Sequence, residues 1–404
     1  MSIFTEKRRI LVACAKGIPP FLARELEALH YPILFTRETG IETEGTMEDA
    51  IRLNLHLRTA SRVLYYLDSF TAHTPEQLHA QVYRLPWETY VPDKGYVTVH
   101  SFIRTDSVRD PRFATLKCKD GIVDRIRDMT GQRPDSGNER SGTVVFLYWH
   151  DNRCNVYLDT SGESLSKRGY RKIPMEAPMQ ETLAAAVITA TGWNGAGHFV
   201  NPMCGSGTLA IEAAWIALNR AAGYLRDDYG FMHLKEFDVE LWRKLRAEAK
   251  AVPSRKLGGR IIATDIRPQA IQAARQNAQI AGVNHLIEFA ACDFAATTVP
   301  DGGGVVVLNP EYGERMGQGT DLEPTYRRIG DFFKQKCLNY TGYVFTGNLE
   351  LGKKIGLRSN RRILFHNSRI ECRLLAFPLY DGTKRKSKLA ATGGSTASSP
   401  ADRR

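Results

Sequence analysis

The sequence lacks paired cysteines and long apolar runs, and each absence narrows the class of protein. Its seven cysteines are odd in number, are scattered over 404 residues and form no CxxC pair. This pattern offers neither a disulfide framework nor a zinc site, so we expect no metal and a reducing, cytoplasmic location. No apolar stretch approaches the roughly 20 residues that span a bilayer. The apolar run after Arg9 breaks at Lys16, short of the ~7–15 residues of a secretory signal core, so no membrane partner is expected.

Negative charge is scarce relative to positive charge. Lysine and arginine number 55 against 44 aspartates and glutamates, which gives a net charge of +11. A protein that neutralises phosphates releases condensed counterions, so a basic excess favours a polyanionic partner such as RNA. A basic enzyme that binds no nucleic acid fits the net charge equally well.

The pattern of apolar residues changes part of the way along the chain. Residues 1–60 and 62–160 mix strands and helices in an α+β style, with an amphipathic helix predicted over Pro111–Met129. From Met179 onward, helices alternate with short hydrophobic strands, which predicts a parallel, doubly wound sheet. An aromatic and charged insertion over 220–258 interrupts this alternation, and the sequence assigns it no role. Beyond Asp381 the composition predicts disorder.

A glycine-rich loop follows the first strand of the C-terminal half. It comprises Asn201, Pro202, Met203, Cys204, Gly205, Ser206, Gly207 and Thr208. Glycines at a strand-to-helix turn let the backbone approach a ligand closely, and the helix N-terminus that follows favours negative charge. NAD-binding folds use the same geometry with a third glycine, which this loop lacks. The loop predicts a cofactor site without identifying the cofactor.

Two acids stand where the next two strands end. Asp265 follows Ile261–Ala263, where a carboxylate can accept hydrogen bonds from ribose hydroxyls. Asp293 follows Ile287–Ala290, where an acid can bind an adenine amine. The insertion separates Asp265 from the glycines by far more than the ~20 residues of a dinucleotide site. A surface aspartate that caps the following helix is the alternative for Asp265.

The most informative motif is Asn309-Pro310-Glu311-Tyr312, at the end of the strand Val305–Leu308. Methylation of an exocyclic amine requires the nitrogen lone pair to be freed from ring conjugation and aimed at the methyl donor. An Asn oxygen and a neighbouring backbone carbonyl can accept the two N–H bonds and achieve this. Tyr312 offers a stacking face for a base taken out of its helix. As a bare string the motif is often a turn, but its place after a glycine loop and two strand-end acids favours amine methylation.

Basic residues gather in two segments that suit phosphate contact. Lys117 and Lys119 lie on the predicted helix Pro111–Met129. The segment 164–171, which joins the two halves of the chain, contains three cations and a tyrosine: Lys167, Arg168, Tyr170 and Arg171. Cations contact phosphates and rings stack on bases, although a solvated linker would have the same composition.

Together these motifs resemble a known family, the THUMP-domain guanine-N2 RNA methyltransferases of large-subunit ribosomal RNA. The resemblance covers about residues 8–382 and rests on the segments 109–114, 117–124, 167–171, 177–186 and 202–208. It implies an α/β fold: a Rossmann-like methyltransferase domain that depends on S-adenosylmethionine (SAM), preceded by an α+β ferredoxin-like segment and a THUMP domain. The implied boundaries are 1–58 for the ferredoxin-like segment, 59–162 for the THUMP RNA-binding domain, 163–382 for the methyltransferase domain and 383–404 for a disordered basic tail.

The resemblance also implies roles for the residues named above. The loop from Asn201 and Pro202 through Cys204, Gly205, Ser206, Gly207 and Thr208 would cradle the methionine part of SAM. Asp265 would hold its ribose and Asp293 its adenine. Asn309, Pro310 and Tyr312 would hold a flipped guanine, whose N2 amine is the implied acceptor in 23S rRNA. Contacts to the RNA would come from Lys117, Lys119, Lys167, Arg168, Tyr170 and Arg171.

Two positions depart from the family pattern. Asn201 stands where an aspartate is usual and loses the charge that would attract the cofactor. Glu311 replaces a second proline, which adds flexibility and a negative charge beside the reacting centre.

These departures leave alternatives open. One is a guanine-N2 methyltransferase that acts on tRNA, and another is a catalytically weakened RNA-binding or ribosome assembly factor on the same fold. An NAD-dependent oxidoreductase is a third, against which the missing glycine and the Asn-Pro-x-Tyr strand end argue. The sequence does not define the target nucleotide or the oligomeric state.

Overall fold

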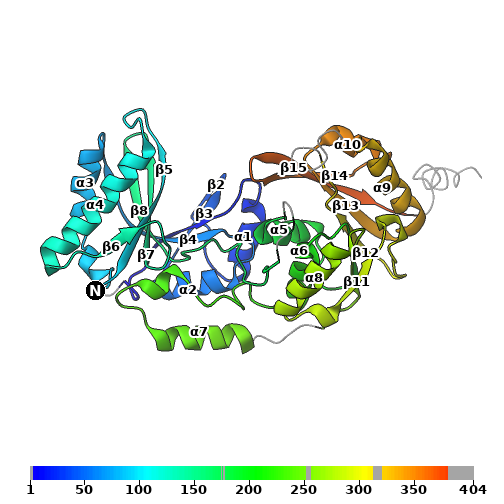
Figure 1. Cartoon of the computed structure of the whole chain (residues 1–404), viewed down its shortest axis with the longest axis horizontal. Coiled ribbons are helices and arrows are strands. Elements are labelled where there is room, and N and C mark those ends of the chain that lie inside the picture. The colour runs from blue at the N-terminus through cyan, green and yellow to red at the C-terminus, as the bar shows by residue number, and fades with distance from the viewer. Residues whose placement is uncertain (1–2, 174, 176–177, 252–255, 313–320, 381–404) are drawn as a thin grey trace, which may run out of the picture.

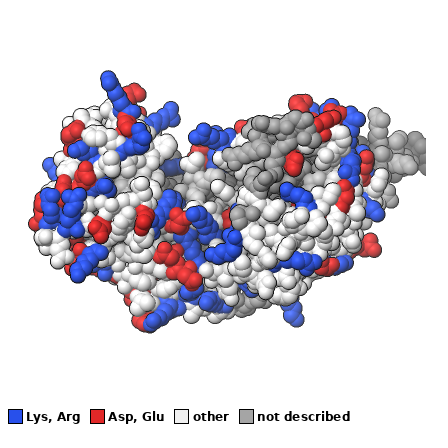
Figure 2. All heavy atoms as spheres, in the orientation of Figure 1, with Lys and Arg blue, Asp and Glu red and all other residues white. Residues whose placement is uncertain are grey.

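The computed structural model describes residues 3–173, 175, 178–251, 256–312 and 321–380. These residues form two lobes, each built on one β-sheet (Figure 1). In the same orientation, Figure 2 shows the molecular surface hollowed between the lobes. Among the described helices, none combines the length and the apolar character needed to cross a membrane. The predicted basic tail, 383–404, lies outside the described residues.

The N-terminal lobe is an eight-stranded sheet with the strand order β2-β3-β1-β4-β8-β7-β5-β6. Its strands are β1 (Arg8–Ala13), β2 (Phe35–Arg37), β3 (Gly40–Gly45), β4 (Arg62–Thr71), β5 (Tyr96–Arg104), β6 (Asp135–Gly137), β7 (Thr143–His150) and β8 (Arg153–Asp159). Its helices are α1 (Pro19–Ala28), α2 (Met47–His56), α3 (Pro75–Tyr83), the short η1 (Trp87–Thr89) and α4 (Pro111–Thr130). Because β4 pairs with both β1 and β8, the sheet continues across the domain boundary expected between residues 58 and 59.

Local sequence signals account for the helix ends in this lobe. α2 begins with a capping box, in which the Thr46 backbone N–H donates to the Asp49 carboxylate at 2.7 Å and the Asp49 N–H donates to the Thr46 hydroxyl at 3.4 Å. α4 begins after Asp110, whose side chain caps the first turn, and ends at Gly131 in the left-handed region, with φ 73°. The helix predicted over Pro111–Met129 is therefore confirmed.

The C-terminal lobe is a seven-stranded sheet with the strand order β11-β10-β9-β12-β13-β15-β14. Its strands are β9 (His198–Pro202), β10 (Ile261–Asp265), β11 (Ile287–Ala291), β12 (Gly304–Leu308), β13 (Tyr340–Thr346), β14 (Arg361–Asn367) and β15 (Ile370–Pro378). Its main helices are α5 (Glu181–Thr191), α6 (Thr208–Ala217), α7 (Val239–Ala251), α8 (Pro268–Ile280), α9 (Glu323–Lys336) and α10 (Leu349–Lys354). β9 to β13 run parallel, as predicted, and β15 and β14 add an antiparallel hairpin at one edge.

Helices cover both faces of this second sheet. Phe199 and Ile261 pack on one side with residues of α5, α6 and α8, whereas the next residue of each strand, Val200 and Ile262, packs on the other side with α9. Successive side chains of a strand point to opposite faces, so these strands carry apolar residues on both faces. With both faces covered, the carboxyl edge of the sheet is the part that can receive a ligand.

The insertion 220–258 crosses from the C-terminal lobe back to the N-terminal lobe (Figure 1). The Gly223 N–H donates to the Leu55 carbonyl at 2.8 Å, and the Lys235 N–H donates to the Tyr90 carbonyl at 2.9 Å. Its helix α7 packs against α2 and buries Trp242. We call residues 220–251 the brace, because they contact both lobes, an arrangement that the sequence did not suggest.

Candidate functional site

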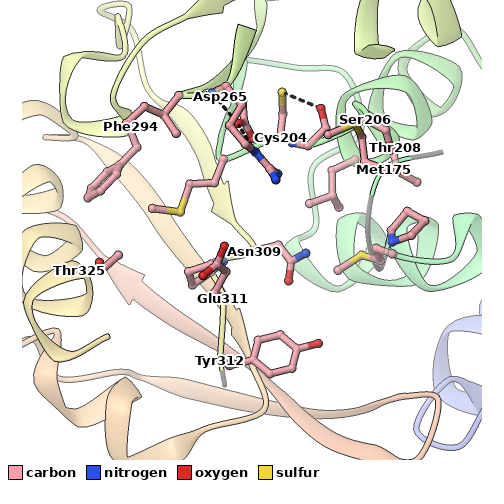
Figure 3. Close-up of a pocket in the computed structure, with 18 of the residues that line it drawn as sticks. Met175, Cys204, Ser206, Thr208, Asp265, Phe294, Asn309, Glu311, Tyr312 and Thr325 are labelled. Carbon is pink, nitrogen blue, oxygen red and sulfur yellow. Dashed lines mark hydrogen bonds and ion pairs between the residues drawn. The ribbon is translucent and has the colours of Figure 1, made fainter. Parts of the chain in front are cut away.

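A cavity of about 510 Å³ opens at the carboxyl ends of the parallel strands of the C-terminal lobe (Figure 3). It lies where the strand order reverses between β9 and β12, the place at which open α/β sheets collect ligands. Most of the residues predicted to hold a cofactor or a target base line it: Cys204, Gly205, Ser206, Thr208, Asp265, Asp293, Asn309, Pro310 and Tyr312. Motifs that are more than 100 residues apart in the sequence thus share one site.

The glycine loop between β9 and α6 owes its shape to three left-handed residues. Met203, Gly205 and Gly207 have φ values of 58°, 55° and 83°. A Cβ atom added to Gly205 would meet nothing within 4 Å, so the space above this residue is open to a ligand. A Cβ atom on Gly207 would lie 3.0 Å from Ala274 of α8, so this glycine permits close helix packing instead.

Asp265 ties the glycine loop to the next strand. One carboxylate oxygen accepts the Gly205 backbone N–H at 2.9 Å, and the other accepts the Arg267 N–H at 3.0 Å. The side chain is almost fully buried and still borders the cavity. Asp265 therefore stabilises the conformation of the glycine loop, in addition to any contact that it makes with a ligand in the cavity.

Asp293 is paired at the mouth of the cavity. Its Oδ1 accepts hydrogen bonds from the Ala295 N–H at 2.9 Å and from the Arg328 guanidinium at 2.7 Å. Partial burial alone would raise the pKa of this carboxyl group, but these two bonds hold the pKa below its ordinary value. The same guanidinium lies 4.9 Å from the centre of the Phe294 ring. Asp293 is thus a carboxylate with one oxygen engaged.

Asn309 presents the least satisfied polar group of the site. Its Oδ1 is buried and has no hydrogen-bond partner among the described residues. A buried acceptor without a donor costs free energy, so such an atom marks a place where a ligand donor is expected. Asn309 and Glu311 both line the cavity (Figure 3).

Tyr312 and Glu311 form the lower wall of the cavity in Figure 3. The Tyr312 hydroxyl accepts a hydrogen bond from the Asn367 amide at 2.8 Å, which fixes the ring against the β14–β15 hairpin. The Glu311 carbonyl accepts the Tyr326 hydroxyl at 3.2 Å, while the Glu311 carboxylate is exposed.

Asn201 does not contribute to the cavity, and its prediction as a cofactor contact is corrected. Its side chain is fully buried, and its Nδ2 donates to the Val307 carbonyl of the neighbouring strand at 2.8 Å. An ionised aspartate could not make this donation, so asparagine suits the position that the strand gives it. Pro202 and Gly207 also belong to the frame of the loop and not to the cavity lining.

Two of the predicted RNA contacts are wrong. The Arg168 side chain is 2% exposed and donates to the carbonyls of Leu165 and Arg58. The Tyr170 ring is fully buried, packs edge-on against Trp215 and donates its hydroxyl to Glu212 at 3.0 Å. Neither side chain has a face left for a phosphate or a base.

The other predicted RNA contacts differ in exposure. Arg171 is turned inward, where it donates to the Met179 carbonyl at 2.6 Å and to the Thr208 hydroxyl at 3.1 Å. It therefore supports the glycine loop. Lys167 is exposed beside Glu163, and Lys117 and Lys119 are partly exposed on α4, so their contact with RNA stays a prediction.

Cys204 contributes a thiol to the lining of the cavity. Burial, followed by the charge of Asp265, raises the pKa of the Cys204 thiol, which keeps it protonated at neutral pH. Within the described residues, no three His, Cys, Asp or Glu side chains are grouped as a metal site.

Several residues that line the cavity were not identified from the sequence motifs. Ile266, which directly follows Asp265, is 66% exposed and offers an apolar surface at the mouth. The sequence does show a large apolar residue directly after a strand-end acid, although only the structure shows that it is exposed. Arg328 and Asn367 carried no signal, because they come from α9 and from the β14–β15 hairpin, whose position only the fold defines.

Parallel sheets with helices on both faces occur in many enzymes. The antiparallel hairpin at one edge, combined with an Asn-Pro-x-Tyr strand end over the cavity, places the C-terminal lobe in the class of Rossmann-like methyltransferases. More narrowly, the chain belongs to the family of RMKL-like methyltransferases, because the model of the RMKL-like methyltransferase domain matches residues 168–376. The RlmL ferredoxin-like domain matches residues 9–64 and the THUMP domain matches residues 72–159, which confirms the predicted fold class.

Individual relatives support this assignment. The ribosomal RNA large subunit methyltransferase K/L of Syntrophotalea carbinolica is 37% identical over 92% of this chain and 53% of its own length. The chain thus spans about half the length of the relatives of that name. A Synechocystis protein with the provisional name RNA methyltransferase slr0064 is 32% identical over 92% of this chain and 97% of its own length.

Two solved structures share the whole architecture. SMU.472, provisionally described as a methyltransferase and complexed with SAH, has a TM-score of 0.84 at 26% identity and covers 94% of this chain and 100% of its own. A Listeria monocytogenes protein described as a predicted N6-adenine-specific DNA methylase has a TM-score of 0.82 at 28% identity, over 93% of this chain and 97% of its own.

Proposed function

We propose that the chain transfers a methyl group from SAM to the exocyclic N2 of a guanine in RNA, with 23S rRNA as the substrate. The observation that carries the proposal is the Asn309 oxygen, buried without a partner among the described residues in the cavity that Tyr312 also lines. The K/L relatives are named for methylation of large-subunit ribosomal RNA, and SMU.472 was solved with SAH. Both support the same reaction.

The cavity fits the methionine and ribose parts of SAM. The open space above Gly205 and the N-terminus of α6 at Thr208 suit a carboxylate, because free backbone N–H groups and the helix dipole favour negative charge. Asp265 accepts two backbone N–H bonds, and its carboxylate has further lone pairs for ribose hydroxyls.

The cavity also fits the adenine of SAM. Ile266 and Phe294 supply apolar surface for the ring at the mouth of the cavity. The two hydrogen bonds of Asp293 fall on Oδ1, so Oδ2 can accept the adenine amine. When bound, SAM supplies an electrophilic methyl group on a sulfonium centre.

The Asn309 motif would prepare the acceptor amine. The Oδ1 of Asn309 accepts one N–H of the amine, and the Pro310 carbonyl accepts the other. Two acceptors in fixed positions hold the nitrogen lone pair out of conjugation with the ring. The Tyr312 ring, fixed by Asn367, provides the face on which the flipped base stacks.

The N-terminal lobe would hold the RNA so that its target reaches the cavity. A THUMP match, the net charge of +11 and the exposed or partly exposed Lys117, Lys119 and Lys167 support RNA binding by phosphate contacts. The brace fixes this lobe relative to the cavity, which suits a substrate that must engage both.

Adenine N6 is the second candidate acceptor. It is also an exocyclic amine, so two oxygen acceptors would orient it in the same way. The description of the Listeria structure, which names N6-adenine and DNA, favours this candidate.

Calorimetry with SAM and transfer of radiolabelled methyl groups to unmodified 23S rRNA and tRNA test the proposal. We expect SAM to bind to the parent chain and to Asn309→Ala alike, and only the parent to label 23S rRNA. Label in tRNA alone would identify tRNA as the substrate in place of 23S rRNA. SAM binding without transfer to either RNA would favour an assembly factor, and no SAM binding would contradict the proposed reaction.

A further inference from the structure

One face of the N-terminal sheet carries a stack of aromatic rings. Phe102 of β5 lies opposite Tyr148 of β7, and their rings are parallel, with centroids 5.3 Å apart and an angle of 9°. The Tyr148 ring in turn is parallel to the His150 ring, at 6.3 Å and 7°. Phe102 is 48% exposed and the His150 side chain is 41% exposed.

These rings point away from the helices α3 and α4. Successive residues of β5 and β7 alternate between the two faces, and Leu147 and Trp149 are fully buried on the face that α3 and α4 cover. In Figure 1, α3 and α4 lie on the outer side of the sheet, so the ring-bearing face is on the side of the methyltransferase domain. Figure 2 shows the hollow between the lobes there.

Cations border the rings in the next row of the sheet. Arg104 pairs in register with His150, and His150 pairs with Arg153 of β8. Both arginines are exposed. One acid, Asp151 in the β7–β8 turn, lies 3.1 Å from the His150 ring nitrogen. A row of rings beside a row of guanidinium groups is complementary to a nucleic acid strand with unstacked bases and a phosphate backbone.

We propose that this surface, the aromatic face (Phe102, Tyr148, His150, Arg104 and Arg153), binds unpaired bases of the RNA strand that carries the target nucleotide. A base extends the ring stack on the exposed Phe102 ring, which the Tyr148 ring supports from its other side, and phosphates lie against the two arginines. Every base has a π-face, so the surface selects single-stranded RNA over duplex without reading a sequence. The inference rests on the proposed function, since it assumes RNA as the substrate.

Cross-strand aromatic pairs also stabilise sheets, so the test must separate binding from folding. Phe102→Leu with Tyr148→Leu removes the flat rings and keeps apolar bulk. Met129→Ala, which alters a 56% exposed residue on α4, is the matched control on the opposite side of the lobe. Fluorescence anisotropy of a short labelled oligo(A) strand and of a matched RNA duplex reports both affinities on the full chain.

We expect the double leucine variant to bind oligo(A) at least about tenfold more weakly, since each base–ring stack has about that effect. Affinity for the duplex and for SAM should stay within about twofold, as should all affinities of Met129→Ala. Arg104→Gln with Arg153→Gln should flatten the salt dependence for oligo(A), with a slope change of about 0.7 per lost phosphate contact.

Unchanged oligo(A) affinity in the double leucine variant would overturn the inference, as would an equal loss for oligo(A) and the duplex. The binding assay needs no methyl transfer. If the chain methylates no RNA but binds oligo(A) through these rings, the result would support the aromatic face as an RNA-binding surface. It would contradict only the proposed function.

Discussion

At the scale of single residues, Asn309 carries the most specific expectation. Its buried oxygen is proposed to align the amine only while the methyl group transfers, and such interactions appear in kcat. We expect Asn309→Ala to lower kcat by about 10²–10³, by analogy with the loss of one oxyanion-hole donor. Asn309→Asp keeps an oxygen and should lose less. Single-turnover kinetics measure both, and a near-normal kcat in Asn309→Ala would exclude this mechanism.

Glu311 is the residue at which this chain departs from its family beside the reacting centre. Its exposed carboxylate can stabilise the positively charged cofactor more than the transition state, in which that charge is being neutralised. We expect Glu311→Gln to keep kcat within a few-fold of the parent and Glu311→Pro to equal or exceed it, because proline stiffens the loop. A loss of two orders of magnitude in Glu311→Gln, with SAM and RNA affinities intact, would instead make Glu311 an acid or base.

The position of some site residues could be predicted from the sequence, and the burial of others could not. Motif position was enough to place Asp265, Asp293 and Asn309 at one cavity, because strand ends of a parallel sheet share an edge. Composition alone could not show that Arg168 and Tyr170 face inward. Their burial depends on Glu212 and Trp215, which come more than 40 residues later and reach them only in the folded chain.

At the scale of elements, the brace is the least expected part of the fold. Trp242 of α7 is 7% exposed and packs against the rings of Tyr229 and Phe231, at centroid distances of 5.5 and 5.4 Å. We expect Trp242→Ala to lower the free energy of unfolding by about 3–5 kcal/mol, as for other buried aromatics. Denaturant unfolding checks this, with Val239→Ala, an exposed position of the same helix, as the control.

The brace variant also tests the role of the lobe arrangement. If the brace positions the N-terminal lobe for the cavity, Trp242→Ala should reduce methylation of RNA more than it reduces SAM affinity. Equal losses of both would show that Trp242 stabilises the fold without positioning the lobes.

A histidine in the N-terminal sheet makes the stability of that lobe depend on pH. Burial, then the charges of Arg140 and Arg62, lowers the pKa of His100 to about 4. Its Nε2 accepts the Arg140 side-chain N–H at 2.9 Å. Above pH 6.5 the ring is neutral in the folded and unfolded chains, so it makes no pH-dependent contribution. Between pH 6.5 and 4 only the unfolded chain takes up the proton, so stability falls as the solution is acidified.

His100→Gln should therefore lose less stability than the parent between pH 7 and 5. The glutamine oxygen can still accept the Arg140 bond, and it does not titrate. After allowance for solvent screening of a half-exposed ring, we expect a difference of about 1 kcal/mol. Thermal unfolding at several pH values measures it, and parallel curves for the two proteins would contradict the assigned role.

Some elements could be predicted from the local sequence, whereas others depend on contacts between distant segments of the chain. Periodicity and strand length predicted the parallel sheet and the helix α4, since both are local properties. The brace and the continuity of the N-terminal sheet through β4 could not be predicted, because each depends on pairing between distant segments.

At the scale of the whole molecule, we propose that two lobes joined by the brace act together on one amine of a large RNA. The lobes meet around a hollow (Figures 1 and 2). The cavity lies at the carboxyl edge of the C-terminal sheet. A target nucleotide that stacks against Tyr312 must leave its helix, and the single-stranded neighbours that this creates need a surface to bind. We therefore expect the two sites to bind one substrate.

The most direct test of the central claim is to identify the methylated nucleoside. The full chain is incubated with SAM that carries a deuterated methyl group and with unmodified 23S rRNA, and the digested RNA is analysed by mass spectrometry. We predict the label in N2-methylguanosine and none when Asn309→Ala replaces the parent. Label in N6-methyladenosine, or equal labelling by the two proteins, would contradict this prediction.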